Sequence, residues 1–114
     1  MKVIINKYIP PKGYLAITLF GLVFAKRELG KEESNHEAIH IRQGNEMLWI
    51  FFYLFYVIEW LIRLIQYRDK AKAYYNISFE REAYSNQHNL NYLNTRKWYS
   101  WVKYIYNDGT ITNN

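Results

Sequence analysis

The chain has 114 residues, a length that suits one domain, and it contains no cysteine. Disulfides, thiolate metal sites and cysteine nucleophiles are therefore excluded, so any metal must be held by His, Asp or Glu. The formal net charge is +5, but the Lys and Arg residues are scattered, which predicts a solvated surface and no nucleic-acid partner. We expect a single domain over residues 1–114.

The N-terminal part predicts a small β layer. Residues 3–5 are β-prone, and Pro10, Pro11 and Gly13 form a turn signal after them. Residues 14–25 are rich in β-branched and aromatic side chains, and Gly21 interrupts them. We therefore expect two extended pieces with a bend at Gly21.

A helix is predicted to follow the polar residues 26–35. Ser34 and Glu37 have the spacing of a capping box. If Glu37 is catalytic, it cannot also cap the helix, so the helix should begin earlier, near Lys31 or Glu32. The helical pattern then continues from residue 36 toward residue 66, with Gly44 as the plausible weak point.

Residues 47–65 form the longest apolar stretch. Its unbroken part covers only residues 47–58, and a run of that length is more typical of a buried helix than of a membrane span. Glu59 and Arg63 are four residues apart and can pair on one helical face. We predict burial of this helix within a soluble, cytoplasmic domain; membrane association through residues 47–65 is the alternative.

The C-terminal part predicts further helices. Residues 68–72 are a polar connector, residues 77–86 a helix, and residues 89–106 an aromatic helical segment. The expected fold class is α+β, in which short strands or a hairpin precede an active-site helix and a helical C-terminal part.

Residues 36–40 read His-Glu-Ala-Ile-His. On a helix, His36 and His40 lie one turn apart on the same face, so both imidazoles can bind one Zn²⁺. Glu37 lies about a third of a turn from His36, where its carboxylate can take a proton from zinc-bound water instead of binding the metal. The alternative is two histidines on one helix face with a solvated glutamate.

A catalytic zinc requires a third protein ligand. Glu46 would lie at a different azimuth from His40 on a continuous helix, so it could reach the ion only if Gly44 breaks the helix. His88 lies in a polar stretch and is expected on the surface. The candidates are Glu46, Glu59, Glu80, Glu82 and His88.

The motif, followed about forty residues later by Glu-x-x-Ala, resembles the gluzincins, both minimal soluble ones and membrane-bound prenyl-protein and heat-shock peptidases. The resemblance spans residues 36–84, and the second motif here is Glu80-Arg81-Glu82-Ala83. It implies a small zincin-like domain with Glu80 as the third ligand. In such folds the extended segment before the active helix pairs with an extended substrate, which implies this role for residues 16–26.

Helix geometry favours Glu80 over Glu82. Glu80 and Ala83 are three residues apart and share a face, whereas Glu82 points away and is expected to be a surface carboxylate. The family often has Asp directly after that Ala, where this chain has Tyr84. The Tyr84 hydroxyl could support Glu80, or its ring could simply pack.

The expected function is that of a zinc-dependent metallopeptidase that hydrolyses peptide bonds by attack of zinc-bound water, assisted by Glu37. Its metal ligands would be His36, His40 and Glu80, and its partners peptide or protein substrates. Two alternatives stay open: a non-catalytic membrane-associated or partner-binding helical protein with an accidental motif, and a zinc-binding scaffold that has lost turnover.

Overall fold

Three short strands precede the helices in residues 1–108, which the computed structural model describes. The strands are β1 (Lys2–Ile5), β2 (Ala16–Leu19) and β3 (Leu22–Ala25), in the sheet order β1-β3-β2. β1 runs parallel to β3, whereas β2 and β3 form an antiparallel hairpin. Phe20 and Gly21 both have positive φ at its turn, as a type I′ hairpin turn requires, so the predicted bend at Gly21 is confirmed.

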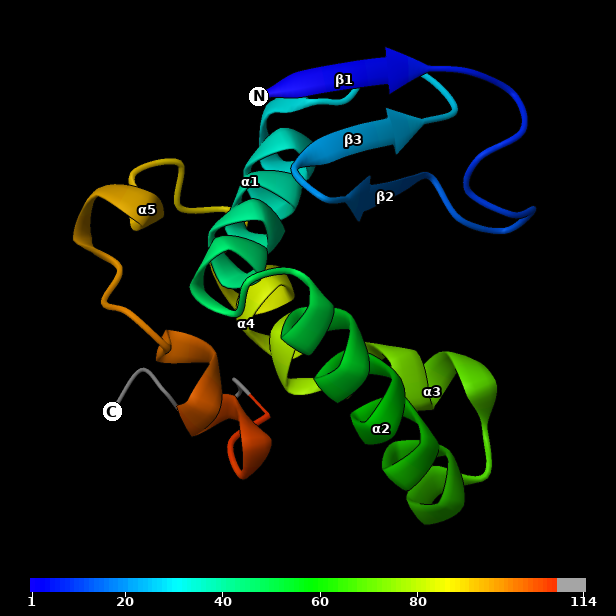
Figure 1. Cartoon of the computed structure of the whole chain (residues 1–114), viewed down its shortest axis with the longest axis vertical. Helices are drawn as coiled ribbons and strands as arrows, with labels where there is room; N and C mark the ends of the chain where they lie inside the picture. The colour runs from blue at the N-terminus through cyan, green and yellow to red at the C-terminus, as the bar shows by residue number, and fades with distance from the viewer. Residues whose placement is uncertain (109–114) are drawn as a thin grey trace.

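The helices follow as α1 (Lys31–Glu46), α2 (Ile50–Tyr67), α3 (Lys70–Tyr75), α4 (Ser78–Asn86), α5 (Tyr92–Thr95) and a 3-10 turn, η1 (Ser100–Ile105). In Figure 1 the sheet lies beside α1 at one end of the molecule, and α2 extends away from it. The α+β class is confirmed. The polar connector predicted over residues 68–72 is shorter in the structure, because α3 already begins at Lys70. The Asp69 side chain caps this helix by accepting a hydrogen bond from the Lys72 amide.

The predicted helical segment over residues 89–106 is wrong as a continuous helix. α5 ends at Thr95, and Tyr99 has φ 59°, a left-handed conformation that interrupts a helix. The Tyr99 amide donates to a Glu46 carboxylate oxygen, and its hydroxyl donates to the Glu46 carbonyl. These contacts with α1 fix the interruption.

α1 begins at Lys31, as expected if Glu37 does not cap it. The Gly30 amide donates to Oε1 of Glu33 (2.8 Å), and Arg27 pairs with the same carboxylate. A glutamate side chain that reaches back to the residue before the helix satisfies one of the unpaired amides there. Glu37 therefore lies in the second turn with its carboxylate free for another role.

The expected continuous helix over residues 36–66 is wrong, because the chain turns between α1 and α2. Leu48 and Trp49 have φ of 54° and 59°, and the amides of Met47 and Trp49 both donate to the carbonyl of Gly44. The Trp49 ring folds back onto α1, where a Cβ at position 44 would lie 2.3 Å from a ring carbon. Gly44 thus permits the turn without itself breaking the helix.

The core joins α2, α4 and η1. Phe79 is fully buried, and its ring centroid lies 4.6 Å from those of Phe52 and Trp101. Met47 and Ile77 complete this buried cluster. Because the cluster fixes α4 against α1 and α2, it also sets the position of Glu80 in the first turn of α4.

The prediction that the apolar helix is buried within the domain is wrong. α2 is long and apolar enough to cross a membrane by length and composition, but of its 18 residues Phe52 alone is buried. The cause is that the domain covers one side of α2 and leaves the other uncovered. We call this uncovered side the outer face of α2; it comprises Ile50, Phe51, Leu54, Phe55, Val57, Ile58, Leu61, Ile62 and Ile65, all exposed.

We predict that Gly44→Ala destabilises the fold by about 1–3 kcal/mol, because the new methyl group overlaps the Trp49 ring. Urea unfolding followed by circular dichroism measures this change. Gly30→Ala is the matched control, since a Cβ there meets only the end of the Glu33 side chain at 3.5 Å. Equal stability of the two variants would contradict the packing described for Trp49.

Candidate metal centre

Three predicted ligands converge between α1 and α4. Nε2 of His36 lies 3.1 Å from Nε2 of His40, and Oε1 of Glu80 lies 3.1 Å from each nitrogen. All three side chains are buried, and the ligand atoms lie within 4.8 Å of one another. Two imidazole nitrogens and one carboxylate oxygen at this spacing could hold one metal ion.

The other candidate ligands lie elsewhere. Glu59 pairs with Arg63, as predicted, and accepts hydrogen bonds from the amide and hydroxyl of Ser78 at the start of α4. His88 is exposed, as expected.

Glu46 and Glu82 both bind Arg96. The expectation that Glu82 is a surface carboxylate is wrong, since its side chain is fully buried.

Both histidines are oriented by glutamine amides. Nδ1 of His36 lies 2.8 Å from Oε1 of Gln87, and Nδ1 of His40 lies 2.7 Å from Oε1 of Gln43. An amide oxygen can only accept, so each Nδ1 carries the proton and donates it. In the neutral imidazole this leaves the Nε2 lone pair free, and Nε2 is the atom that faces Glu80. Such outer hydrogen bonds are typical of metal-ligating histidines.

The orientation of the Gln43 amide is itself fixed. Its Nε2 donates to Oε1 of Glu82 (2.9 Å) and to the carbonyl of Phe79 (3.0 Å). Both acceptors would repel an amide oxygen, so only one of the two amide orientations satisfies the network. Gln43 is fully buried, and it therefore connects the metal-facing side of α1 to the interior of α4.

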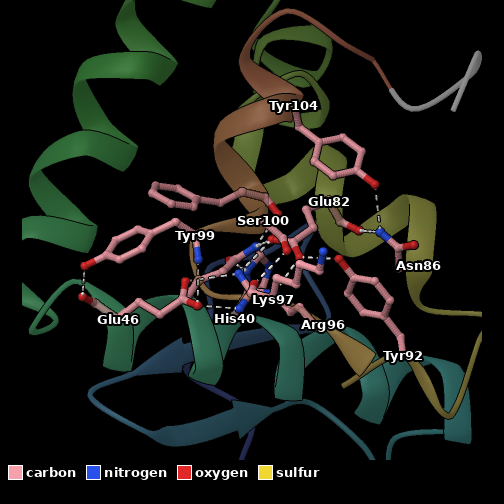
Figure 2. Close-up of polar contacts among 12 residues, drawn as sticks. His40, Glu46, Glu82, Asn86, Tyr92, Arg96, Lys97, Tyr99, Ser100 and Tyr104 are labelled. Atoms are coloured by element: carbon pink, nitrogen blue, oxygen red, sulfur yellow. Dashed lines mark hydrogen bonds and ion pairs between the residues drawn. The ribbon is translucent and has the colours of Figure 1, made fainter. Parts of the chain in front are cut away.

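A buried ion triad holds Glu82 in place. Arg96 forms two hydrogen bonds with Glu82 and two with Glu46, at 2.5–3.1 Å, and all three side chains are fully buried. Figure 2 shows Arg96 between the two carboxylates, with Tyr92 and Tyr99 around them. The Tyr92 hydroxyl donates to Glu82 and the Tyr99 amide to Glu46, which offsets the second negative charge.

Glu80 has its own support from α2. The Tyr56 hydroxyl donates to Oε2 of Glu80 at 2.6 Å, which leaves Oε1 directed at the two histidines. Tyr84, which sequence reasoning left open between support and packing, does not fill this role. Its ring lies against the His36 ring at 4.3 Å, and its hydroxyl bonds with that of Tyr74.

The three ligands are electrostatically coupled. Burial alone would lower the pKa of His40, but the charge of Glu80 and its hydrogen bond raise that pKa to about 9. Burial would raise the pKa of Glu80, but the neighbouring charge of His40 holds it well below its usual range. In the metal-free protein a proton thus neutralises the ionised carboxylate, and a cation that binds there must displace it.

Glu37 lies beside the ligands without joining them. Its Oε1 accepts a hydrogen bond of 2.8 Å from the Thr18 hydroxyl on β2. Together with His40 and Glu80, Glu37 lines a cavity of about 370 Å³ whose walls are mostly apolar side chains of α2 and β2. It also lines a second cavity of about 560 Å³ beside His36. The Glu37 carboxylate therefore lies at the junction of the two cavities.

Sequence reasoning named the three side chains that converge here but missed the residues that hold them in place. Gln43 and Tyr56 carry no motif, and their roles depend on contacts with α4. Gln87 follows α4 and lies 51 positions from His36. A polar residue at a buried helix position, such as Gln43 three residues after His40, is the one local signal available.

Comparison of the chain with protein-family models, curated proteins and solved structures returned no match. The resemblance to the gluzincins therefore rests on the two motifs alone.

We predict a graded loss of metal affinity across three variants, measured with Zn²⁺ in competition with a chromogenic chelator. Glu80→Ala removes a ligand and should abolish tight binding. Tyr56→Phe removes only the support of that ligand and should weaken binding about tenfold or more. Glu32→Ala, an exposed carboxylate in the first turn of α1, is the control and should bind as the unaltered chain does.

The opposite order would contradict the assignment. Two results would therefore count against it: a folded Glu80→Ala variant that still binds zinc tightly, or equal zinc affinities for Tyr56→Phe and Glu32→Ala. In either case His36, His40 and Glu80 do not form the site as described. Glu82→Ala is not a suitable surface control, because it removes one of the two buried carboxylates that bind Arg96 and is expected to destabilise the fold strongly.

Proposed function

We propose that this chain is a minimal zincin-like metallopeptidase with one Zn²⁺ held by His36, His40 and Glu80. The observation that carries the proposal is the convergence of these three side chains next to Glu37, at the junction of two cavities. A structural zinc site would use four protein ligands. Three ligands beside a cavity favour a catalytic site with a position left for water or substrate.

The donor set suits zinc. Two neutral imidazoles and one carboxylate match the His₂Glu ligand set of catalytic zinc sites, and the chain has no cysteine to offer a softer site. The glutamine contacts direct both Nε2 atoms toward Glu80 before any metal binds. Little reorganisation of the ligands is then needed, which supports tight binding.

Glu37 is the proposed general base. When bound, the zinc would lower the pKa of a water molecule and polarise the scissile carbonyl. Thr18 holds Oε1 of Glu37, so Oε2 is the oxygen that accepts the proton from the attacking water. Glu37 then transfers this proton to the departing amine nitrogen, which completes hydrolysis with no net change in the protein.

The cleft favours an extended peptide as substrate. β2 is an edge strand, since β3 pairs with it on one side and β1 lies beyond β3. The Lys26 amide donates to the Leu15 carbonyl, and the alternation of an antiparallel ladder then turns the main-chain groups of Ala16 and Thr18 away from β3. The Thr18 carbonyl accepts a hydrogen bond from the Tyr53 hydroxyl, which leaves the Ala16 groups and the Thr18 amide at this edge. An added strand could pair there. Apolar substrate side chains would fit between Ile17, Phe52 and Trp60, which line the more apolar of the two cavities.

We predict that Glu37→Gln retains about one zinc per chain, because Glu37 is not a ligand, but lowers peptide cleavage at least about a thousandfold. Zinc is counted by elemental analysis, and cleavage is followed with an unfolded protein as substrate. Thr18→Val is a milder matched change that should lower cleavage and spare the metal. Equal cleavage by Glu37→Gln and the unaltered chain would assign the chemistry to other residues.

A further inference from the structure

The outer face of α2 is a continuous apolar surface. At 100° per residue its nine members fall within an arc of about 160°, and the helix is about 27 Å long. Among them Ile50 and Ile65, near the two ends, are 70% and 78% exposed. An apolar patch of this size is uncommon on a protein surface and marks an interaction site.

The charged residues of α2 point away from this face. Glu59 binds Ser78 on α4, and Arg63 donates to the carbonyl of Ile105 in η1. Both side chains are mostly buried, at 16% and 11% exposure. Within the described part of the chain, the charged side chains of α2 are thus used to attach the helix to the domain. The side chains on the outer face of α2 therefore carry no charge.

The same contacts limit how the helix can meet a partner. Because α4 and η1 cover the inner side of α2, this helix cannot be surrounded by lipid as a lone spanning helix is. A helix with one apolar face and one attached face lies in the plane of a bilayer interface. The geometry therefore fits docking on a membrane better than crossing it.

Charge distinguishes a bilayer from a second copy. The chain carries a formal charge of +5, so two copies repel each other, whereas anionic lipid headgroups attract the chain. Exposed cations follow the apolar helix directly, with Arg68, Lys70 and Lys72 at its C-terminal end. η1 adds Lys103, and the neighbouring Tyr106 is 96% exposed. Tyrosine and lysine are typical of the headgroup level.

We propose that the outer face of α2 docks this domain onto the surface of an anionic lipid bilayer. The apolar side chains enter the boundary between headgroups and acyl chains, and the adjacent lysines and arginines lie among the headgroups. This docking requires neither a bound metal nor cleavage, so it holds or fails independently of the proposed function.

The test is flotation of the full chain, synthesised in a cell-free system with preformed vesicles present. One vesicle set is phosphatidylcholine with about one third phosphatidylserine, and the other is phosphatidylcholine alone. The double variant Ile58→Glu with Ile62→Glu places two charges in the middle of the face. The matched control is Leu90→Glu, which alters an exposed apolar residue outside α2.

We expect the unaltered chain and Leu90→Glu to float with the anionic vesicles, and alkaline carbonate to release them. Flotation should fall at least tenfold for the double variant and for vesicles without phosphatidylserine. If the double variant loses its helical circular dichroism, the single variant Ile65→Glu at the exposed end of α2 replaces it in the test. Its flotation with anionic vesicles should fall severalfold.

Three outcomes would overturn the proposal. Unchanged flotation of a folded α2 variant would assign lipid binding to another surface. Retention through the carbonate wash would mean that the helix crosses the bilayer. Absence of flotation together with a dimer mass in sedimentation would mean that the outer face of α2 binds a second copy of this chain.

Discussion

The site depends on the hydrogen bond between His40 and Gln43. An imidazole on a helix can rotate and can carry its proton on either nitrogen, so sequence spacing alone does not make it a metal ligand. Here the Gln43 amide fixes both choices for His40, and Glu82 in turn fixes the amide. The metal-facing nitrogen of His40 is thereby aligned, through Gln43, by the Glu82 side chain of α4, the helix that also supplies Glu80.

The ion triad explains how so small a domain can maintain this alignment. Burial of a carboxylate without a partner would be costly, and Arg96 with its two acidic partners satisfies all three groups. Arg96 follows α5, so the C-terminal part of the chain closes over the side of α1 and α4 away from the cavities. The sheet serves a different purpose, since it presents Thr18 to Glu37 and an open edge to the cleft.

Much of the local structure could be predicted from the sequence, because short-range rules govern it. The hairpin around Gly21, the start of α1 and the preference for Glu80 over Glu82 follow from turn chemistry, capping and helical spacing. The turn at Trp49 could not be predicted, since its left-handed residues are stabilised by packing on Gly44. The partners Tyr56, Gln87 and Arg96 also stayed hidden, because contacts between distant segments bring them to the site. The exposure of α2 was missed for another reason: an apolar helix has the same pattern whether protein or lipid covers it.

The central claim is that one metal ion binds between α1 and α4 through two imidazoles and one carboxylate. X-ray absorption at the zinc edge, on the full chain loaded with one equivalent of Zn²⁺, tests it most directly. The account predicts a four- or five-coordinate zinc with only nitrogen and oxygen neighbours at about 2.0–2.2 Å, and outer-shell scattering from two imidazole rings. A six-coordinate spectrum, or scattering from fewer than two imidazoles, would contradict it.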